Sequence, residues 1–87
     1  MAAELERAGW TKLFHNVRVM RVQVDLLMRD PRGLLLIIEV KSDAESGMAH
    51  LARGQFRRLL RVCTFLARWE PIELRLALVS GGRLRLL

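Results

Sequence analysis

Apolar and polar positions along the chain predict two adjacent strands joined by a tight turn. Residues 22–30 and 33–42 are short runs rich in aliphatic and β-branched side chains, which is typical of strands. Residues 11–20 predict a further strand before them. Pro31 suits the first corner of a type I turn and Gly33 the left-handed position that follows, so we expect a hairpin with a three-residue loop.

Two helices are predicted on either side of these strands. Residues 2–8 have the pattern of a helix end, with Gly9 as its stop. Residues 48–69 predict a long helix that Asp43 or Ser46 would cap. Proline at position 71 blocks its continuation.

Two strands are predicted after the long helix. Residues 72–79 and 83–87 are apolar or alternating, and a Gly-Gly turn separates them. The predicted order is α-β-β-β-α-β-β, an α/β fold. A helix between strands 34–41 and 74–79 makes them parallel neighbours with a right-handed crossover.

The two faces of the predicted hairpin differ in polarity. One face is polar at its open end and apolar near the turn. The other is apolar throughout and is expected to be core. That core face consists of Val22, Val24, Leu26, Met28, Leu36, Ile38 and Val40.

The polar end of the hairpin holds a candidate metal site. Counting back from the turn places Asp25 opposite Glu39 and Gln23 opposite Lys41, with Cβ atoms about 5 Å apart. Two carboxylates so close repel each other unless a cation lies between them. Oxygen ligands suit Mg²⁺ or Mn²⁺, whereas zinc favours Cys and His clusters, which this chain lacks. The alternative is a surface pair between Lys41 and Glu39, with Asp25 solvated at an edge.

The predicted long helix has an apolar half and a basic sector. No Asp or Glu occurs between Ser46 and Trp69, so its arginines lack the i,i+4 partners of an ordinary solvated helix. We expect this sector to contact phosphates, with a solvated surface as the alternative. The basic residues are Arg53, Arg57, Arg61 and Arg68, and the apolar ones are Leu51, Phe56, Leu59, Leu60, Val62, Cys63, Leu66 and Ala67.

Gln55 is the polar exception in the apolar half of that helix. A buried amide needs hydrogen-bond partners. Because Gln55 belongs to the first turns of the helix, we expect it near Glu39 and Lys41. A core glutamine bonded to backbone is the alternative.

Composition limits the classes of function. The 87 residues are 52% hydrophobic with two prolines, which predicts one small globular domain over 1–87. No apolar run reaches the roughly 18 residues of a membrane span, and Glu4 and Glu6 do not suit a signal peptide, so we expect a cytoplasmic protein. The short first helix and the apolar ending predict that the chain is cut from a longer protein or begins and ends inside elements.

Net charge and cysteine content limit the possible binding partners, disulfides and metal sites. The net charge of +6 and the pI near 11.3 indicate a polyanionic partner such as nucleic acid, although an anionic membrane attracts the same charge. The single cysteine, Cys63, excludes an internal disulfide and a cysteine-based zinc site. His15 and His50 are isolated and are expected at surface or cap positions.

Five motifs follow one another along nearly the whole chain. They are Ala2 to Trp10, Asn16-Val17-Arg18, Val24-Asp25-Leu26-Leu27, Ile37-Ile38-Glu39-Val40-Lys41, and Gln55 with Arg57-Arg58-Leu59. In this order and spacing they resemble the YraN-like group of predicted bacterial endonucleases in the PD-(D/E)XK superfamily. The resemblance implies a restriction-endonuclease-like core, in which helices flank a mixed sheet.

The resemblance also implies a function and assigns residues to it. The expected function is Mg²⁺- or Mn²⁺-dependent hydrolysis of nucleic-acid phosphodiesters. Asp25, Glu39 and the Val40 carbonyl would bind the metal, Lys41 would assist the attacking water, and Gln55 would be an accessory catalytic residue. The expected partner is nucleic acid, DNA before RNA, and no membrane; a second copy of the chain is a further candidate.

The chain departs from the family pattern at two places. The family has Gly-Glu where this chain has Val22-Gln23, and its first helix carries a further upstream glutamate that only Glu4 could replace here. Loss of an acid from the metal shell would weaken Mg²⁺ binding. The alternative function is therefore a degenerate, non-catalytic domain that binds nucleic acid or acts as a scaffold.

Overall fold

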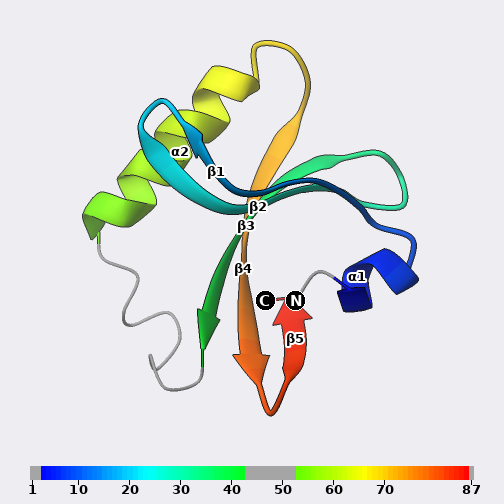
Figure 1. Ribbon diagram of the computed structural model, residues 1–87. Helices are drawn as coiled ribbons and strands as arrows, with labels where there is room; N and C mark the ends of the chain where they lie inside the picture. Colours follow the sequence, from blue (N-terminus) through cyan, green and yellow to red (C-terminus); the bar gives the residue numbers. More distant parts are fainter. Residues whose placement is uncertain (1–2, 43–52, 87) are drawn as a thin grey trace.

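The computed structural model, which describes residues 3–42 and 53–86, contains a twisted mixed sheet with a helix on either side (Figure 1). Its strand order is β1-β2-β3-β4-β5, and only the β3–β4 pair is parallel. This confirms the predicted α/β fold, its element order and the parallel crossover pair. The elements are α1 (Ala3–Arg7), β1 (Thr11–Val19), β2 (Val22–Arg29), β3 (Leu35–Ser42), α2 (Arg53–Leu66), β4 (Ile72–Ser80) and β5 (Arg83–Leu86).

The turn between β2 and β3 forms as its residue types predict. The backbone N–H of Gly33 donates to the Asp30 carbonyl at 2.9 Å, and that of Asp30 donates to the Leu34 carbonyl at 2.9 Å. Gly33 has a φ of 93°, which favours glycine. The Asp30 side chain also accepts hydrogen bonds from the backbone of Arg32 and of Leu34, which holds the loop.

The β2–β3 ladder has the predicted register but ends early. Arg29 pairs with Leu35 and Leu26 with Ile38. The ladder stops there, so Asp25 does not form the expected directly opposed backbone pair. On its other side β2 pairs with β1, which lies at the edge of the sheet.

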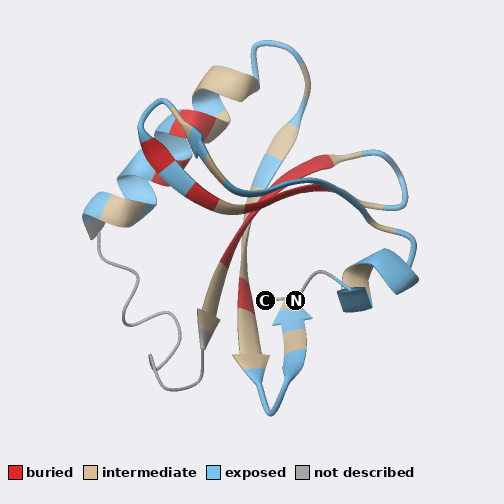
Figure 2. Cartoon of the chain, viewed as in Figure 1, coloured by how far each residue is buried: buried red, intermediate tan, exposed pale blue. Residues whose placement is uncertain are grey.

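Apolar side chains form two clusters, one on each face of the sheet. Figure 2 marks the buried residues, which lie along the central strands and on part of α2. Because Leu35 and Ile37 alternate with Leu36 and Ile38 along β3, the two sets point to opposite faces. The cluster on the α2 face contains Val22, Val24, Leu27, Leu35, Ile37, Leu59 and Val62. The other contains Leu26, Met28, Leu36, Ile38 and Ala77, with Leu5, Trp10, Leu34, Val40, Leu84 and Leu86 packed against it.

The prediction that one face of β2 is apolar throughout was wrong. Val22 and Val24 pack in the α2 cluster, whereas Leu26 belongs to the opposite cluster. The change of face occurs at Asp25. Across from it on β1, Asn16 has a φ of 52°, and a left-handed residue within a strand bends the ladder.

The described part of α2 runs from Arg53 to Leu66, within the predicted span of 48–69. After Leu66, hydrogen-bonded turns extend as far as Trp69, whose backbone N–H donates to the Leu66 carbonyl at 3.0 Å. The proposed caps, Asp43 and Ser46, lie outside the described residues. No helix in the described ranges is long and apolar enough to cross a membrane.

The apolar half of α2 is only partly covered by the sheet. Leu59 and Val62 are fully buried, and Cys63 and Leu66 pack at the margin. In contrast, Phe56 and Leu60, which belong to the same apolar half, are each 42% exposed. A helix lying on a twisted sheet buries only the sector that faces it. Leu51 lies outside the described residues.

Candidate functional site

Asp25 lies where β2 separates from β3. Its Oδ2 accepts a hydrogen bond of 2.9 Å from the backbone N–H of Val40. The carboxylate therefore bonds to β3 just beyond the point at which the backbone ladder ends. This contact brings the Asp25 side chain next to the segment that carries Glu39 and Lys41.

Glu39 is buried, with only 4% of its surface exposed. Its Oε2 accepts a hydrogen bond of 3.0 Å from Gln55 Nε2, and Lys41 Nζ lies 3.8 Å from the same oxygen. Its Oε1 is buried and has no hydrogen-bond partner among the described residues. An unpaired buried carboxylate oxygen destabilises a fold, and a bound cation would remove that penalty.

The acidity of Glu39 reflects this environment. Burial raises its pKa from the ordinary 4.5 to about 7, and the neighbouring Asp25 carboxyl acts in the same direction. The Gln55 hydrogen bond and the Lys41 charge oppose that rise in pKa. With this pKa, the Glu39 carboxyl is partly protonated near neutral pH unless a cation takes the place of the proton.

A cavity of about 250 Å³ opens beside Asp25. It is lined by His15, Asn16, Asp25, Leu26 and Val40. Sequence reasoning missed the first two, because it treated His15 as isolated. Only the β1–β2 register reveals them, since it pairs His15 with Leu26 and so sets Asn16 across from Asp25.

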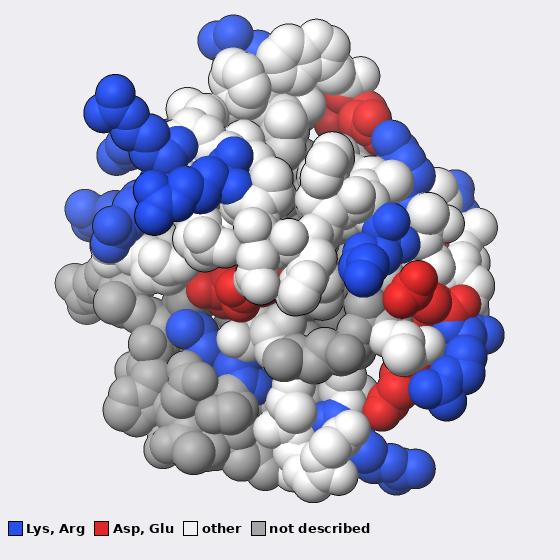
Figure 3. Space-filling view, viewed as in Figure 1, with Lys and Arg blue, Asp and Glu red and all other residues white. Residues whose placement is uncertain are grey.

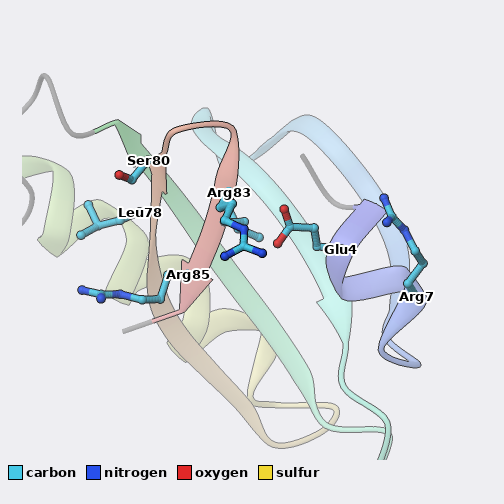
Figure 4. Close-up of a pocket in the computed structure, with 7 residues that line it drawn as sticks. Glu4, Arg7, Leu78, Ser80, Arg83 and Arg85 are labelled. Atoms are coloured by element: carbon cyan, nitrogen blue, oxygen red, sulfur yellow. The ribbon is translucent and has the colours of Figure 1, made fainter.

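A larger cavity, of about 750 Å³, lies between α1 and the β4–β5 hairpin (Figure 4). Glu4 and Arg83 extend toward each other across it, while Arg85 projects from the other side of the hairpin. Glu4 thus faces this cavity and does not line the one at Asp25.

The donor set at Asp25 and Glu39 suits a hard divalent cation. Within residues 3–42 and 53–86, no three Asp, Glu, His or Cys side chains gather into a metal site. Mg²⁺ nevertheless retains several waters and is often held by one or two carboxylates. Two carboxylates, one with an oxygen that is buried and unpaired among the described residues, therefore fit Mg²⁺ or Mn²⁺, and the Val40 carbonyl stays a predicted further ligand.

The predicted nucleic-acid-binding arginines extend along α2. Arg57, Arg61 and Arg68 are exposed, and Figure 3 shows basic atoms gathered over this helix. Among the described residues, no acidic side chain forms an ion pair with any of these three. The side chain of Arg53 lies outside the described part of the structure. Arg58, whose Nε donates to the Gly54 carbonyl at 3.1 Å, adds another exposed charge.

The structure therefore brings together most of the predicted site. Asp25, Glu39, Lys41 and Gln55 converge with the Val40 backbone at one end of the β2–β3 pair. Their catalytic and metal-binding roles stay predictions. Arg57 and Arg61 lie on the same helix as Gln55, and Arg68 lies in the turn that follows it.

Comparison with known proteins gives relatives in one family. A model described as "Uncharacterised protein family UPF0102" matches residues 1–80. A UPF0102 protein of Burkholderia mallei (strain NCTC 10229) is 34% identical over 88 residues, which cover 92% of this chain and 61% of that protein. A UPF0102 protein of Burkholderia pseudomallei (strain 1106a) is 38% identical over 69 residues, which cover 74% of this chain and 48% of that protein.

The chain spans 61% or less of the length of these curated relatives. Among solved structures, SPO1766, a protein of unknown function from Silicibacter pomeroyi, is similar with a TM-score of 0.47 and 18% identity. That alignment covers 95% of this chain and 61% of the other.

Proposed function

This chain belongs to the UPF0102 family, and we propose that it is a metal-dependent nuclease that hydrolyses phosphodiester bonds in nucleic acid. The observation that carries the proposal is the buried Glu39 carboxylate beside Asp25, with one oxygen unpaired among the described residues. Lys41 lies 3.8 Å from the other oxygen of Glu39. Adjacent acids with a lysine suit phosphodiester hydrolysis, and the resemblance to PD-(D/E)XK nucleases adds to that argument.

The acids would hold the metal and the other polar groups would assist. Asp25, Glu39 and the Val40 carbonyl would bind Mg²⁺ or Mn²⁺. When bound, such an ion polarises a phosphate and lowers the pKa of a coordinated water. Lys41 would orient the attacking water or offset the charge that develops on the phosphate. Gln55 would hold the Glu39 carboxylate in place through its 3.0 Å hydrogen bond.

Substrate contacts would come from two surfaces. Arg57, Arg61 and Arg68 are exposed and would bind backbone phosphates along α2. His15 and Asn16 line the cavity beside Asp25 and would contact the nucleotide at the reacting phosphate. DNA is the proposed substrate.

A second candidate is a non-catalytic domain that keeps the fold and binds nucleic acid. One observation favours it. Gln23 stands where the family has an acid, and Glu4 lines a different cavity, so neither supplies a third carboxylate at Asp25. Two acids bind a cation more weakly than three.

A nuclease assay on single-stranded, duplex and branched DNA distinguishes the two functions. The nuclease requires cleavage in Mn²⁺ or Mg²⁺, no cleavage in chelator, and loss of cleavage in Asp25→Asn. Glu73→Gln is the matched control, because Glu73 is exposed on β4 and pairs only loosely with Arg75 at 4.0 Å. Binding without cleavage under every metal condition would support the non-catalytic domain.

A further inference from the structure

Trp69 is the most exposed of the large apolar side chains in the described residues, with 68% of its surface accessible. It follows the last turn of α2 directly, and its N–H donates to the Leu66 carbonyl at 3.0 Å. Full exposure of an indole is unfavourable in water, because its large apolar surface stays hydrated. The position of such a side chain therefore suggests a binding role.

The Trp69 ring is supported by one neighbouring aromatic side chain. It packs edge-on against Phe65, with ring centroids 5.1 Å apart and planes at 70°. The Arg68 guanidinium lies 5.7 Å from the centre of the same Phe65 ring. In an edge-on pair of this kind one ring supports the other, so the indole has a fixed support and an exposed surface.

The loop after the ring is anchored as well. Next along the chain, Glu70 accepts a hydrogen bond of 3.1 Å from Arg29 Nη2, and the second Arg29 nitrogen bonds its other oxygen. This two-point contact ties the end of α2 to β2. Trp69 is therefore presented from a restrained segment, which lowers the entropy lost on stacking.

The surroundings of Trp69 indicate which ligand it would stack on. Arg57, Arg61 and Arg68 are exposed along the same helix and lack acidic partners in the described ranges. The segment 53–66 contains no acidic residue. Unopposed arginines beside an exposed aromatic ring are the combination that binds single-stranded nucleic acid, with phosphates on the charges and a base on the ring.

We propose that Trp69 is a stacking platform for an unpaired base of the nucleic acid that α2 binds. The inference deepens the proposed function: it rests on nucleic-acid binding, but it does not require cleavage. It names a substrate class with a single-stranded segment, such as a flap, a gap or a free end.

Geometry sets the length of that segment. Gln55 lies in the first turn of α2 at the candidate metal site, and the helix rises about 17 Å from there to its last residue, Leu66, at 1.5 Å per residue; Trp69 follows in the turn after it. A stacked strand advances about 3.4 Å per nucleotide, so roughly five nucleotides span this length of helix between the reacting phosphate and the stacked base. Arg57, Arg61 and Arg68 lie between or beside these two points.

A binding comparison in chelator tests the platform without any cleavage. The probes are a thymidine octamer and an abasic octamer that has the same phosphates but no bases. Base–aromatic stacking contributes about 1–3 kcal/mol, so the thymidine octamer should bind wild-type protein roughly 5- to 150-fold more tightly than the abasic one. In Trp69→Ala this preference should disappear, whereas affinity for the abasic octamer stays within about twofold.

Two further variants keep the test decisive. Trp69→Phe should retain part of the preference, because a smaller ring still stacks. The chain has two tryptophans, so Trp10→Phe leaves Trp69 as the sole indole. Its fluorescence should be quenched by the thymidine octamer and little changed by the abasic one.

Each outcome decides the proposal. An unchanged preference in Trp69→Ala, or no quenching, overturns the platform while leaving the nuclease in place. Loss of a dimer in Trp69→Ala, with no effect on either octamer, would show that a second protein copy covers the ring and also overturns it. Quenching and base preference without cleavage in any metal would support the platform and reject the nuclease. Failure of wild-type protein to bind either octamer would overturn the platform, and cleavage of duplex or branched DNA in Mn²⁺ would then still support the nuclease.

Discussion

Gln55 on α2 donates a hydrogen bond of 3.0 Å to Oε2 of Glu39 on β3. Lys41 lies near the same oxygen, while Oε1 stays buried and unpaired among the described residues. Gln55 thus binds one oxygen of the carboxylate, and the other oxygen is available to a cation. A neutral amide can do this without adding a charge that would repel the metal.

Removing the Gln55 donor should make metal binding more sensitive to pH. In Gln55→Met, Glu39 loses a hydrogen bond that lowers its pKa, so its pKa rises further from the ordinary 4.5 and protons compete better with Mg²⁺. We expect apparent Mg²⁺ affinity to fall several-fold at pH 7 and to approach the wild-type value at pH 9. Calorimetric titration at both pH values measures this. Gln23→Met, at an exposed position on β2, is the control and should bind Mg²⁺ normally.

Without metal, the protein should lose stability as pH rises toward neutrality. The pKa of Glu39 is about 7 when folded and 4.5 ordinarily, so the folded state binds more protons between these values. The free energy of unfolding should therefore be higher below pH 4.5 and fall through pH 7, by up to about 3 kcal/mol from this group.

Urea unfolding in chelator, compared between wild type and Glu39→Gln, isolates that contribution. The amide cannot ionise, so the difference in unfolding free energy between the two proteins should change across pH 4.5–7 and level off above it. A difference that stays constant over this range would contradict the raised pKa of Glu39.

Metal should stabilise the folded protein through Asp25 and Glu39. At a concentration one hundred times its dissociation constant, a ligand that binds only the folded state adds about 2.7 kcal/mol. For a domain of this size that corresponds to a rise in Tm on the order of 10 °C. Asp25→Asn should abolish most of the rise, and Glu73→Gln should keep it. Equal melting curves in Mn²⁺ and in chelator would count against the metal site.

Lys41 should affect cleavage far more than binding. In the proposed mechanism its ammonium would act on the attacking water or on charge that develops only in the transition state. Lys41→Met should lower the cleavage rate by at least about 100-fold, while affinity for DNA changes less than about threefold. Single-turnover cleavage and a filter-binding assay on the same substrate separate these quantities. Cleavage at the parental rate in purified Lys41→Met would point to a contaminant or another site.

The arginines of α2 should set the salt dependence of binding. Each arginine that contacts a duplex phosphate contributes about 0.9 to the slope of log affinity against log salt. The double change Arg57→Gln, Arg61→Gln should therefore flatten the slope by up to about 2, similarly for all DNA sequences.

A charge-matched control removes two arginines elsewhere. Arg7 lies on α1 and Arg32 in the β2–β3 turn, and both are exposed. Arg7→Gln, Arg32→Gln lowers the net charge equally but should change the slope far less. Equal slopes for the two double variants would mean that the protein attracts DNA by overall charge and not through α2.

Local chemistry along the chain was enough to predict the central part of this fold. Pro31 and Gly33 have backbone preferences that determine the β2–β3 turn, and the turn determines the register of the ladder beyond it. Strand periodicity then places Asp25 and Glu39 near each other. The position of Gln55 on its helix wheel predicts that it is the polar residue facing that site, and it bonds Glu39.

Tertiary structure decided the features that depend on distant segments. Met20 and Arg21 form the β1–β2 turn with φ values of 54° and 65°, although neither is a glycine. The residue types at this turn therefore do not predict the hairpin, and it is this hairpin that brings His15 to the Asp25 cavity. The raised pKa of Glu39 and the exposure of Trp69 likewise follow from what covers each side chain. Periodicity specifies which way a side chain points, but burial depends on the element that packs against it, and that element comes from elsewhere in the chain.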